Sequence, residues 1–209
     1  MLRVLGRPTS INVRKVTWLC VELDIPFVNE PWGDASGTLP LATDQFVALN
    51  PNRMVPVIDD DGFVMWESNS ILRYLASSRE ALELYPTDAR RRARIDQWTD
   101  WQAADLNAAW RYPFMSLVRH APGYDDAGML ANHVRRWTEL MTVLDQQLHA
   151  TGAFVCGDTF TLADVPIGLS VHRWFSTPID HAPLEHVAAY YERMSTREGF
   201  RLYGRNGMP

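Results

Sequence analysis

The stretch LNPNRMVPVIDDDGFVMWESNSILRYLA, from Leu49 to Ala76, carries the most informative pattern in the sequence. Within it, Val55 to Ile58 and Gly62 to Met65 are rich in apolar side chains and predict two short strands. The run Asp59 to Gly62 that joins them is typical of a hairpin turn. Glu67 to Ser77 has apolar residues at helical spacing. The stretch therefore predicts a β-hairpin followed by a helix.

Upstream of this stretch, strands and helices alternate. A strand is predicted at Leu2 to Leu5, a helix at Ile11 to Leu23, a strand at Ile25 to Val28 and a short helix at Phe46 to Leu49. A loop rich in small residues is expected between residues 33 and 41. The order strand–helix–strand–helix–strand–strand–helix matches an α/β thioredoxin-like domain, with a mixed sheet and helices on both faces. We assign this domain to residues 1–79.

The pattern changes after a linker at residues 80–87. From there on no strand is predicted, and helical periodicity takes over. The predicted helices are Ala89–Val118, with a bend near Pro113, Met129–His149, Leu162–Phe175 and Leu184–Met194. Residues 88–209 are therefore expected to form an all-helical domain, in which residues 199–209 have no assigned structure.

Composition narrows the functional classes. The formal net charge is −5, which argues against general binding of nucleic acid. Cys20 and Cys156 cannot build a disulfide framework, and the scattered histidines show no metal-ligand spacing. No apolar run is long enough for a membrane span. We expect a cytoplasmic protein without a metal, with Cys20 in the core.

Two short motifs in the opening stretch suit a small zwitterionic peptide. In Val55-Pro56, proline removes a ladder donor, and a cis bond there would turn the Val55 backbone toward an extended peptide. Glu67-Ser68 opens a helix, where free amides and positive potential favour a carboxylate, and Glu67 could face an ammonium group. Taken singly, each motif is better explained as an edge proline or a helix cap. Their combination favours a binding site.

A hydroxyl group is available where the first helix begins. Ser10 or Thr9 stands at the N-cap position, and Asn12 follows. A hydroxyl there can donate to a thiolate, and the helix dipole also lowers the pKa of a thiol. The alternative is an N-cap without a chemical role.

The motif NP-x-x-x-VP, at residues 50–56, and the motif W-ES-x-x-I-x-x-YL, at residues 66–75, together resemble the N-terminal signature of the cytosolic glutathione transferase superfamily. The resemblance implies that Val55 pairs through its backbone with the cysteinyl unit of glutathione and that Pro56 is cis. Glu67 and Ser68 would bind the γ-glutamyl end. Arg53 and Met54 complete the cofactor-binding set. Arg53 would reach a carboxylate of the ligand.

The family divides by the residue that meets the sulfur. No tyrosine occurs among residues 1–20 and no cysteine precedes Cys20, which leaves a class that uses a hydroxyl. Ser10-x-Asn12 resembles bacterial theta-like or nu-like enzymes, with Thr9 as the alternative sulfur contact. The resemblance favours Ser10, because Asn12 then lies two residues further on and could add a second donor to the sulfur. A second family mark is Thr161-x-x-Asp164, in which both side chains are expected to accept from backbone amides at a helix start.

The acceptor-substrate pocket is expected between the two domains. Its candidates lie at helical spacing in the long predicted helix, together with one aromatic from a later helix, although each aromatic taken alone is better explained as core. The set is Trp101, Ala104, Asn107, Ala108, Arg111, Phe114 and Trp174. With Arg111 as its cation, such a pocket suits an electrophile that has an anionic or polar end.

The resemblance thus implies a glutathione transferase that activates the thiol of its co-substrate, glutathione, for attack on small hydrophobic electrophiles in detoxification. Two alternatives stay open: a glutathione-dependent disulfide reductase or peroxidase, and a non-catalytic binding or scaffold protein. A homodimer is implied. The arginines at positions 90–92 and 94 are expected to face acidic groups of the partner subunit.

Overall fold

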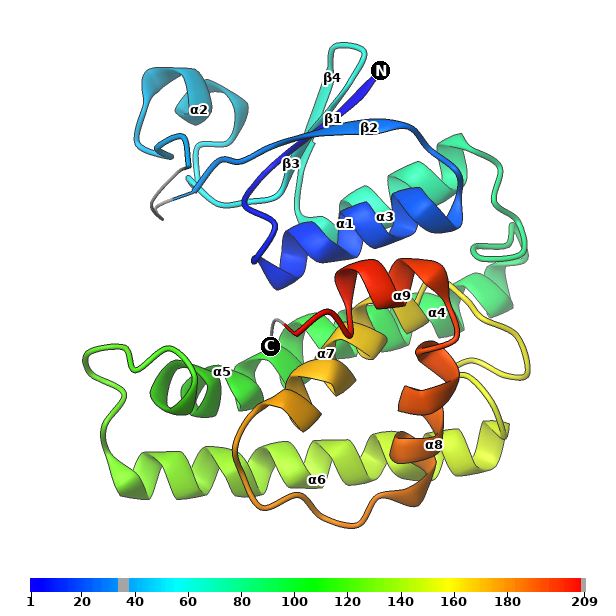
Figure 1. The fold of residues 1–209 in the computed structure, drawn as a ribbon. Coiled ribbons are helices and arrows are strands. Elements are labelled where there is room, and N and C mark those ends of the chain that lie inside the picture. The colour runs from blue at the N-terminus through cyan, green and yellow to red at the C-terminus, as the bar shows by residue number, and fades with distance from the viewer. Residues whose placement is uncertain (34–37, 208–209) are drawn as a thin grey trace.

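The computed structural model describes residues 1–33 and 38–207, and it stacks a mixed four-stranded sheet on a helical region (Figure 1). The strands lie in the order β2-β1-β3-β4, of which only β1 and β2 run parallel. They are β1 (Leu2–Leu5), β2 (Phe27–Glu30), β3 (Val57–Asp60) and β4 (Phe63–Trp66). Residues 34–37, in the middle of the loop predicted at 33–41, lie outside the described residues.

The sheet has helices on both faces. On one face lie α1 (Ile11–Glu22) and α3 (Ser68–Ser78), and on the other lies the short α2 (Asp44–Leu49). Alternation along the strands explains both layers, because Val4 and Ile58 join the large core with α1 and α3, whereas Leu5 and Val57 join a smaller core with Phe46 of α2. The predicted thioredoxin-like arrangement is therefore confirmed.

In the hairpin, β3 lies two residues and β4 one residue beyond the predicted position. Val55 and Pro56 precede β3 and do not belong to it, and Asp59 and Asp60, predicted as turn residues, pair with Val64 and Phe63. The acidic strand end is tolerated because Asp59 accepts from the Arg3 guanidinium at 2.7 Å and from the Gly62 amide at 2.8 Å. Arg3 is far from Asp59 in the sequence, and the bond from the Gly62 amide depends on the conformation of the turn. The local pattern therefore indicated neither contact.

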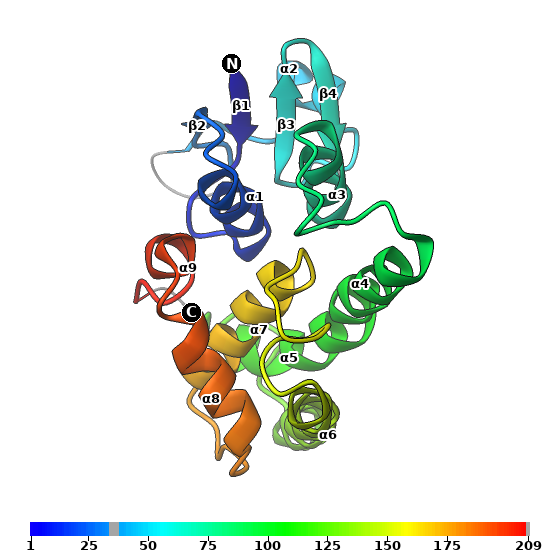
Figure 2. The same cartoon turned by 90° about the vertical axis from the view of Figure 1, so that its right-hand side faces the viewer.

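The remaining helices form a separate layer beneath α1 and α3 (Figure 2). Those predicted at 129–149, 162–175 and 184–194 are found with ends shifted by at most two residues. In the structure the helices are α4 (Ala89–Trp101), α5 (Asn107–Leu117), α6 (Ala127–Thr151), α7 (Asp164–Ser176), α8 (Glu185–Met194) and α9 (Glu198–Tyr203).

The long helix predicted at 89–118 is interrupted at a place that the sequence did not indicate. A π-helical turn, η1 (Gln102–Leu106), separates α4 from α5, while Pro113 lies inside α5. Gln102 is fully buried, and its side chain bonds to Lys15, Asn107 and Ser170. The irregularity therefore coincides with a buried polar cluster that links η1 to α1, α5 and α7, which no local sequence pattern indicates.

Asp164 closes the start of α7 as predicted, whereas Thr161 does not take its predicted part. Its carboxylate accepts from the backbone amides of Thr161 at 2.8 Å and Val155 at 3.0 Å, and from the hydroxyl of Tyr190 at 3.1 Å. The Thr161 hydroxyl donates to the same carboxylate at 3.0 Å. The prediction that this hydroxyl accepts from a backbone amide is therefore wrong, because the buried carboxylate is the stronger acceptor.

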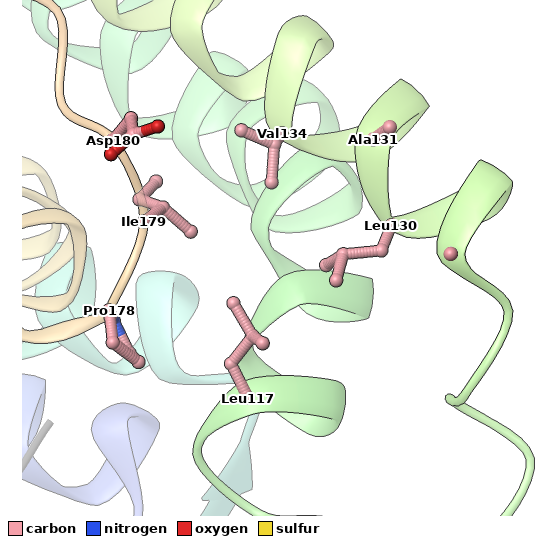
Figure 3. A pocket seen from close by; sticks show the side chains of 8 residues that line it. Leu117, Leu130, Ala131, Val134, Pro178, Ile179 and Asp180 are labelled. Carbon is pink, nitrogen blue, oxygen red and sulfur yellow. The ribbon is translucent and has the colours of Figure 1, made fainter.

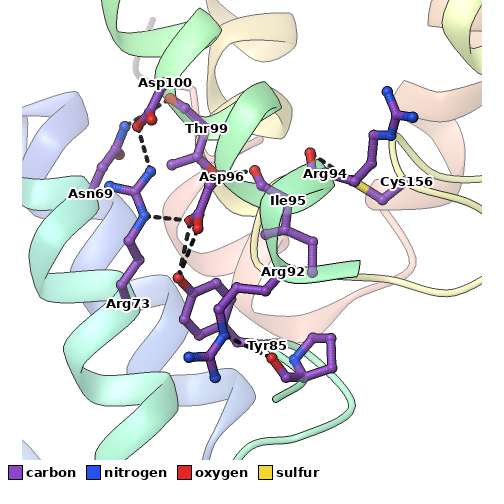
Figure 4. Close-up of polar contacts among 11 residues, drawn as sticks. Asn69, Arg73, Tyr85, Arg92, Arg94, Ile95, Asp96, Thr99, Asp100 and Cys156 are labelled. Carbon is purple, nitrogen blue, oxygen red and sulfur yellow. Dashed lines mark hydrogen bonds and ion pairs between the residues drawn. The ribbon is translucent and has the colours of Figure 1, made fainter. Parts of the chain in front are cut away.

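A polar seam joins α3 to α4 (Figure 4). The guanidinium of Arg73 lies between Asp96, at 2.7 Å, and Asp100, and the Tyr85 hydroxyl donates to Asp96 at 3.0 Å. Deeper in the seam, the side-chain amide of Asn69 donates to the backbone carbonyl of Thr99 at 3.0 Å. The start of the helical region is thus fixed against the helix that follows the hairpin.

The C-terminal segment, for which the sequence predicted nothing, forms α9 and packs against α1. Phe200 is fully buried with its ring 5.1 Å from that of Trp18, and Arg197 pairs with Glu22 at 2.5 Å. Gly199 makes this approach possible, because a Cβ there would lie 2.2 Å from Trp18 Cδ1. The tail therefore closes the side of α1 away from α3. Residues 208–209 lie outside the described part of the chain.

We expect Gly199→Ala to destabilise the fold by about 1–3 kcal/mol, since the added methyl group overlaps a buried indole. Thermal unfolding of the variant checks this. Trp18→Phe should reduce the overlap, so the double variant should lose less than the sum of the two single losses. If Gly199→Ala unfolds at the same temperature as the wild type, α9 is not packed in this way.

Candidate functional site

A small open hollow lies between the loop before β3 and the starts of α1 and α3. Its volume is about 80 Å³, the room of a few water molecules, so it can enclose one end of a peptide-sized ligand. The hollow brings together six of the predicted site residues and two further asparagines, Asn50 and Asn52, that were not predicted. The lining residues are Asn12, Asn50, Asn52, Met54, Val55, Pro56, Glu67 and Ser68.

The N-termini of α1 and α3 meet at this hollow. The hydroxyl of Ser68, the first residue of α3, lies 3.4 Å from Asn12 Oδ1 in the first turn of α1. Neither helix carries an acidic residue in its first turn. The free amides and dipoles of two helices therefore point to one place, which favours a bound anion.

The backbone around the hollow is unusual on both sides. The peptide bond between Val55 and Pro56 is cis, as predicted. Arg53 and Glu67 both adopt positive φ, at 53° and 74°, a conformation that costs a residue with a Cβ about 1–3 kcal/mol. The Glu67 carbonyl nevertheless accepts from Ile71, so the strained residue is integrated into α3. Strain on both sides of one hollow is typical of a functional site.

Ser10 occupies the N-cap position of α1, but its side chain makes no capping hydrogen bond. Its carbonyl accepts from the amide of Arg14, and its amide donates to Arg7. Ser10 is thus the N-cap residue by its backbone, and its half-buried hydroxyl forms no capping bond. Thr9 is exposed in the preceding turn. Neither Ser10 nor Thr9 lines the hollow itself.

Two functional candidates were missed from the sequence. Asn50 is 2% exposed, donates to the Met54 carbonyl at 2.8 Å and accepts from the Asn52 amide at 3.0 Å. It therefore shapes the loop that carries Val55. Its position in the NP-x-x-x-VP motif was visible, but the sequence did not show that its side chain is bonded within the loop and lines the hollow.

The predicted acceptor-substrate set divides into two groups. Ala104, Ala108 and Arg111 are exposed on one side of η1 and α5, and Trp101 and Asn107 are half-buried. The other two candidates belong to the core. Phe114 lies beneath the Arg173 guanidinium, 3.9 Å from its ring centre, and fully buried Trp174 packs edge-on against Trp137. The prediction that Phe114 and Trp174 line an open pocket is therefore wrong.

A second hollow lies away from these residues, between α5, α6 and the segment before α8 (Figure 3). Its volume is about 500 Å³, and none of the predicted site residues lines it. Leu117, Leu130, Val134 and Ile179 point into it, with Asp180 at its edge. An apolar surface hollow of this kind offers few polar groups to orient a substrate.

The protein's own thiols are poor candidates for chemistry. Cys20 is fully buried in the core, as predicted, and burial raises its pKa to about 12. Burial also raises the pKa of Cys156 to about 11. Thiols with such pKa values are weak nucleophiles near neutral pH. A thiol reaction at the hollow therefore requires a thiol that the ligand brings.

Two further properties concern the described residues only. Among residues 1–33 and 38–207, no three His, Cys, Asp or Glu side chains are grouped as metal ligands would be. Within the same ranges, no helix has the length and apolar character that crossing a membrane would require.

Fold and hollow together define a thioredoxin-like protein with a helical C-terminal region and a hollow that two helix N-termini line and neither cysteine lines. Residues 9–78 match the family model described as the N-terminal domain of glutathione S-transferase. The chain is 31% identical to glutathione S-transferase GstB of Escherichia coli K12 over 96% of both chains, and 29% identical to glutathione S-transferase 3 of Zea mays over 96% of this chain and 91% of that one.

Solved structures agree with the sequence relatives. The theta class glutathione S-transferase of Xanthomonas axonopodis pv. citri, solved with glutathione bound, superposes with a TM-score of 0.89 at 33% identity, covering 97% of this chain and 96% of that one. The chain belongs to the glutathione S-transferase family. The predicted family and fold are thereby confirmed, and the relatives support the prediction that the chain is a glutathione transferase.

Proposed function

We propose that the chain binds glutathione at the hollow and activates its thiol for attack on small hydrophobic electrophiles. The observation that carries the proposal is the meeting of the α1 and α3 N-termini beside the cis peptide before β3. That site offers positive potential for a carboxylate and free backbone groups for an extended peptide. Glutathione supplies both, together with a thiol.

The ligand is proposed to span the hollow from its γ-glutamyl end. Ser68 and the first amides of α3 would receive the γ-glutamyl carboxylate, and Glu67 would face the ammonium group. The backbone of Val55 would pair with the cysteinyl unit, held in place by cis Pro56. Met54 in the lining and Arg53 at the exposed rim would meet the glycine end.

The thiol is proposed to lie at the start of α1. Ser10 would donate its free hydroxyl to the sulfur, and Asn12 would add a second donor. Both donations favour the thiolate over the thiol, and the α1 dipole acts in the same direction. Thr9, exposed one residue earlier, remains the alternative contact. The protein then contributes positioning and a lowered thiol pKa.

The electrophile is proposed to approach from η1 and α5. Trp101 provides an apolar wall, Ala104 and Ala108 leave space, and Arg111 provides an exposed positive charge. Asn107 is engaged by Gln102 at 2.9 Å and would act from the floor of the pocket. An aryl halide or enone with an anionic substituent fits this chemistry.

The quaternary and cellular predictions are part of the same proposal. We propose a cytoplasmic homodimer in which residues 1–79 and 88–209 act as two domains around the linker 80–87. Exposed Arg90, Arg91 and Arg94 on α4 support a contact with acidic groups of the partner subunit. Sedimentation at increasing salt would test this, because screened charge pairs should weaken the dimer.

A direct comparison of reactions tests the proposed activity. The purified protein is assayed with glutathione and either an aryl halide that bears a carboxylate or a small disulfide. We expect conjugation of the halide to be the faster reaction. Turnover of the disulfide alone would indicate a reductase, and the absence of a saturable glutathione complex by calorimetry would indicate a non-catalytic protein.

A further inference from the structure

Lys15 is the only lysine in the sequence, which contains nineteen arginines. It lies in α1, one turn beyond Asn12, and only 1% of its surface is exposed. Lysine is rarely buried to this extent, because its ammonium group loses its hydration. A single lysine in such a position, next to the proposed site, requires a physical reason.

The Lys15 ammonium group connects the two sides of the proposed site. It donates to Asn69 Oδ1 at 3.1 Å and to Gln102 Oε1 at 3.0 Å. Asn69 directly follows Ser68, the residue proposed to bind the γ-glutamyl carboxylate. Gln102 opens η1, on the proposed electrophile side, and donates to Asn107 at 2.9 Å. The Lys15 ammonium group is thus linked to the γ-glutamyl side of the site through Asn69 and to the electrophile side through Gln102.

The other ends of this network are fixed. Asn69 donates to the carbonyl of fully buried Thr99 at 3.0 Å, and Gln102 donates to the fully buried Ser170 hydroxyl on α7 at 2.9 Å. A change at Lys15 is therefore transmitted to α3, η1 and α7, because the acceptors cannot turn away without breaking these bonds.

The charges around Lys15 leave its ammonium group undercompensated. Burial and the positive charge of Arg173 on α7 lower its pKa to about 7, while the carboxylate of Glu67 at the start of α3 acts in the opposite direction. On α1, the neighbouring Arg14 is also buried. On the α4 and η1 side, Asp100 pairs with Arg73 and Asp105 is exposed.

We propose that Lys15 is a positioning residue of the glutathione site: it holds the start of α3 in register with η1, and the negative charge of bound glutathione stabilises its charged form. The proposal rests on the proposed function. Its physical basis is reciprocity, because an anion that favours the ammonium form must itself bind more tightly to that form.

The single lysine allows a direct test. In protein labelled with ¹³C-lysine, the ε-carbon signal reports Lys15 alone, and its pH titration is recorded without ligand and with saturating S-methylglutathione, which has no free thiol. We expect the ligand to raise the titration midpoint by about one unit or more. An unchanged midpoint in a saturated complex overturns this inference alone. Failure to form a saturable complex overturns the proposed function as well.

Two variants separate positioning from simple stability. Lys15→Met should raise KM for glutathione about tenfold with a smaller change in kcat. Gln102→Glu places a permanent carboxylate beside the ammonium group, so it should raise the midpoint in the free protein and reduce the response to S-methylglutathione. The second variant keeps the test valid if the first does not fold.

Arg193→Met serves as the matched control. Arg193 donates to the Ala153 carbonyl on the far side of the helical region, so its loss should lower thermal stability and leave KM unchanged. If Lys15→Met behaves in the same way, with lower stability and an unchanged KM, Lys15 is only structural and the inference is wrong.

Discussion

Replacing Ser10 by alanine is expected to lower kcat for glutathione conjugation about 100-fold, the usual effect of removing one donor to a developing or stabilised anion. The hydroxyl is free of any capping bond, so the substitution should leave α1 and the thermal stability essentially unchanged. The pKa of the bound thiol should rise at the same time, because the thiolate loses its donor. Steady-state kinetics and titration of the bound thiol check both effects.

Thr9→Val is the matched control for this prediction. It removes the neighbouring hydroxyl from an exposed turn and should leave kcat and the bound-thiol pKa close to their wild-type values. The reverse result, in which Thr9→Val is impaired and Ser10→Ala is not, would assign the sulfur contact to Thr9. Wild-type behaviour of both variants would show that no hydroxyl at this helix start activates the thiol.

Asp164→Ala is expected to destabilise the fold by about 2–5 kcal/mol, since two buried backbone amides lose their acceptor and each costs about 1–3 kcal/mol when left unpaired. The amides belong to Val155 and Thr161, and Asp164 itself is fully buried. Thermal or denaturant unfolding measures the loss. Thr161→Val removes only one donor to the same carboxylate and should cost about 1 kcal/mol. Equal losses would contradict this ranking.

The same residue predicts a dependence of stability on pH. Burial raises the pKa of Asp164 to about 6, above its value in the unfolded chain. Between about pH 4 and 6 the folded state therefore binds more protons than the unfolded state, so this contribution to stability falls as pH rises. Asp164→Asn cannot titrate there. The stability advantage of the wild type over Asp164→Asn should accordingly shrink as the pH is raised from about 4 to 6.

The opening stretch was read correctly where local pattern decides the outcome. The β-hairpin and the following helix follow from the pattern of residues 49–76, and the helix that begins after Ser10 follows from its apolar periodicity. The cis bond at Pro56 was implied only by the family resemblance, because a valine–proline pair alone is better explained as a trans edge proline. The two-residue shift of β3 came from Asp59, whose turn-like character is overridden by Arg3 on a neighbouring strand. Propensity is a weak guide where such a partner exists.

Other features depend on contacts that no local window contains. The π-helical turn is bonded through Gln102 to Lys15 and Ser170, and α9 packs closely against the Trp18 indole at Gly199. The assignment of Trp174 to a pocket was wrong because helical spacing shows which residues share a face but not which layer covers that face. Its neighbour Trp137 lies on another helix.

The most direct test of a thiol-activating glutathione site is the pH titration of the thiolate absorbance of glutathione bound to the wild-type protein. We predict a midpoint at least about one pH unit below that of free glutathione, because the α1 dipole and the Ser10 hydroxyl favour the charged sulfur. A bound thiol that titrates at the same pH as free glutathione would contradict the assignment of this hollow as the activating site.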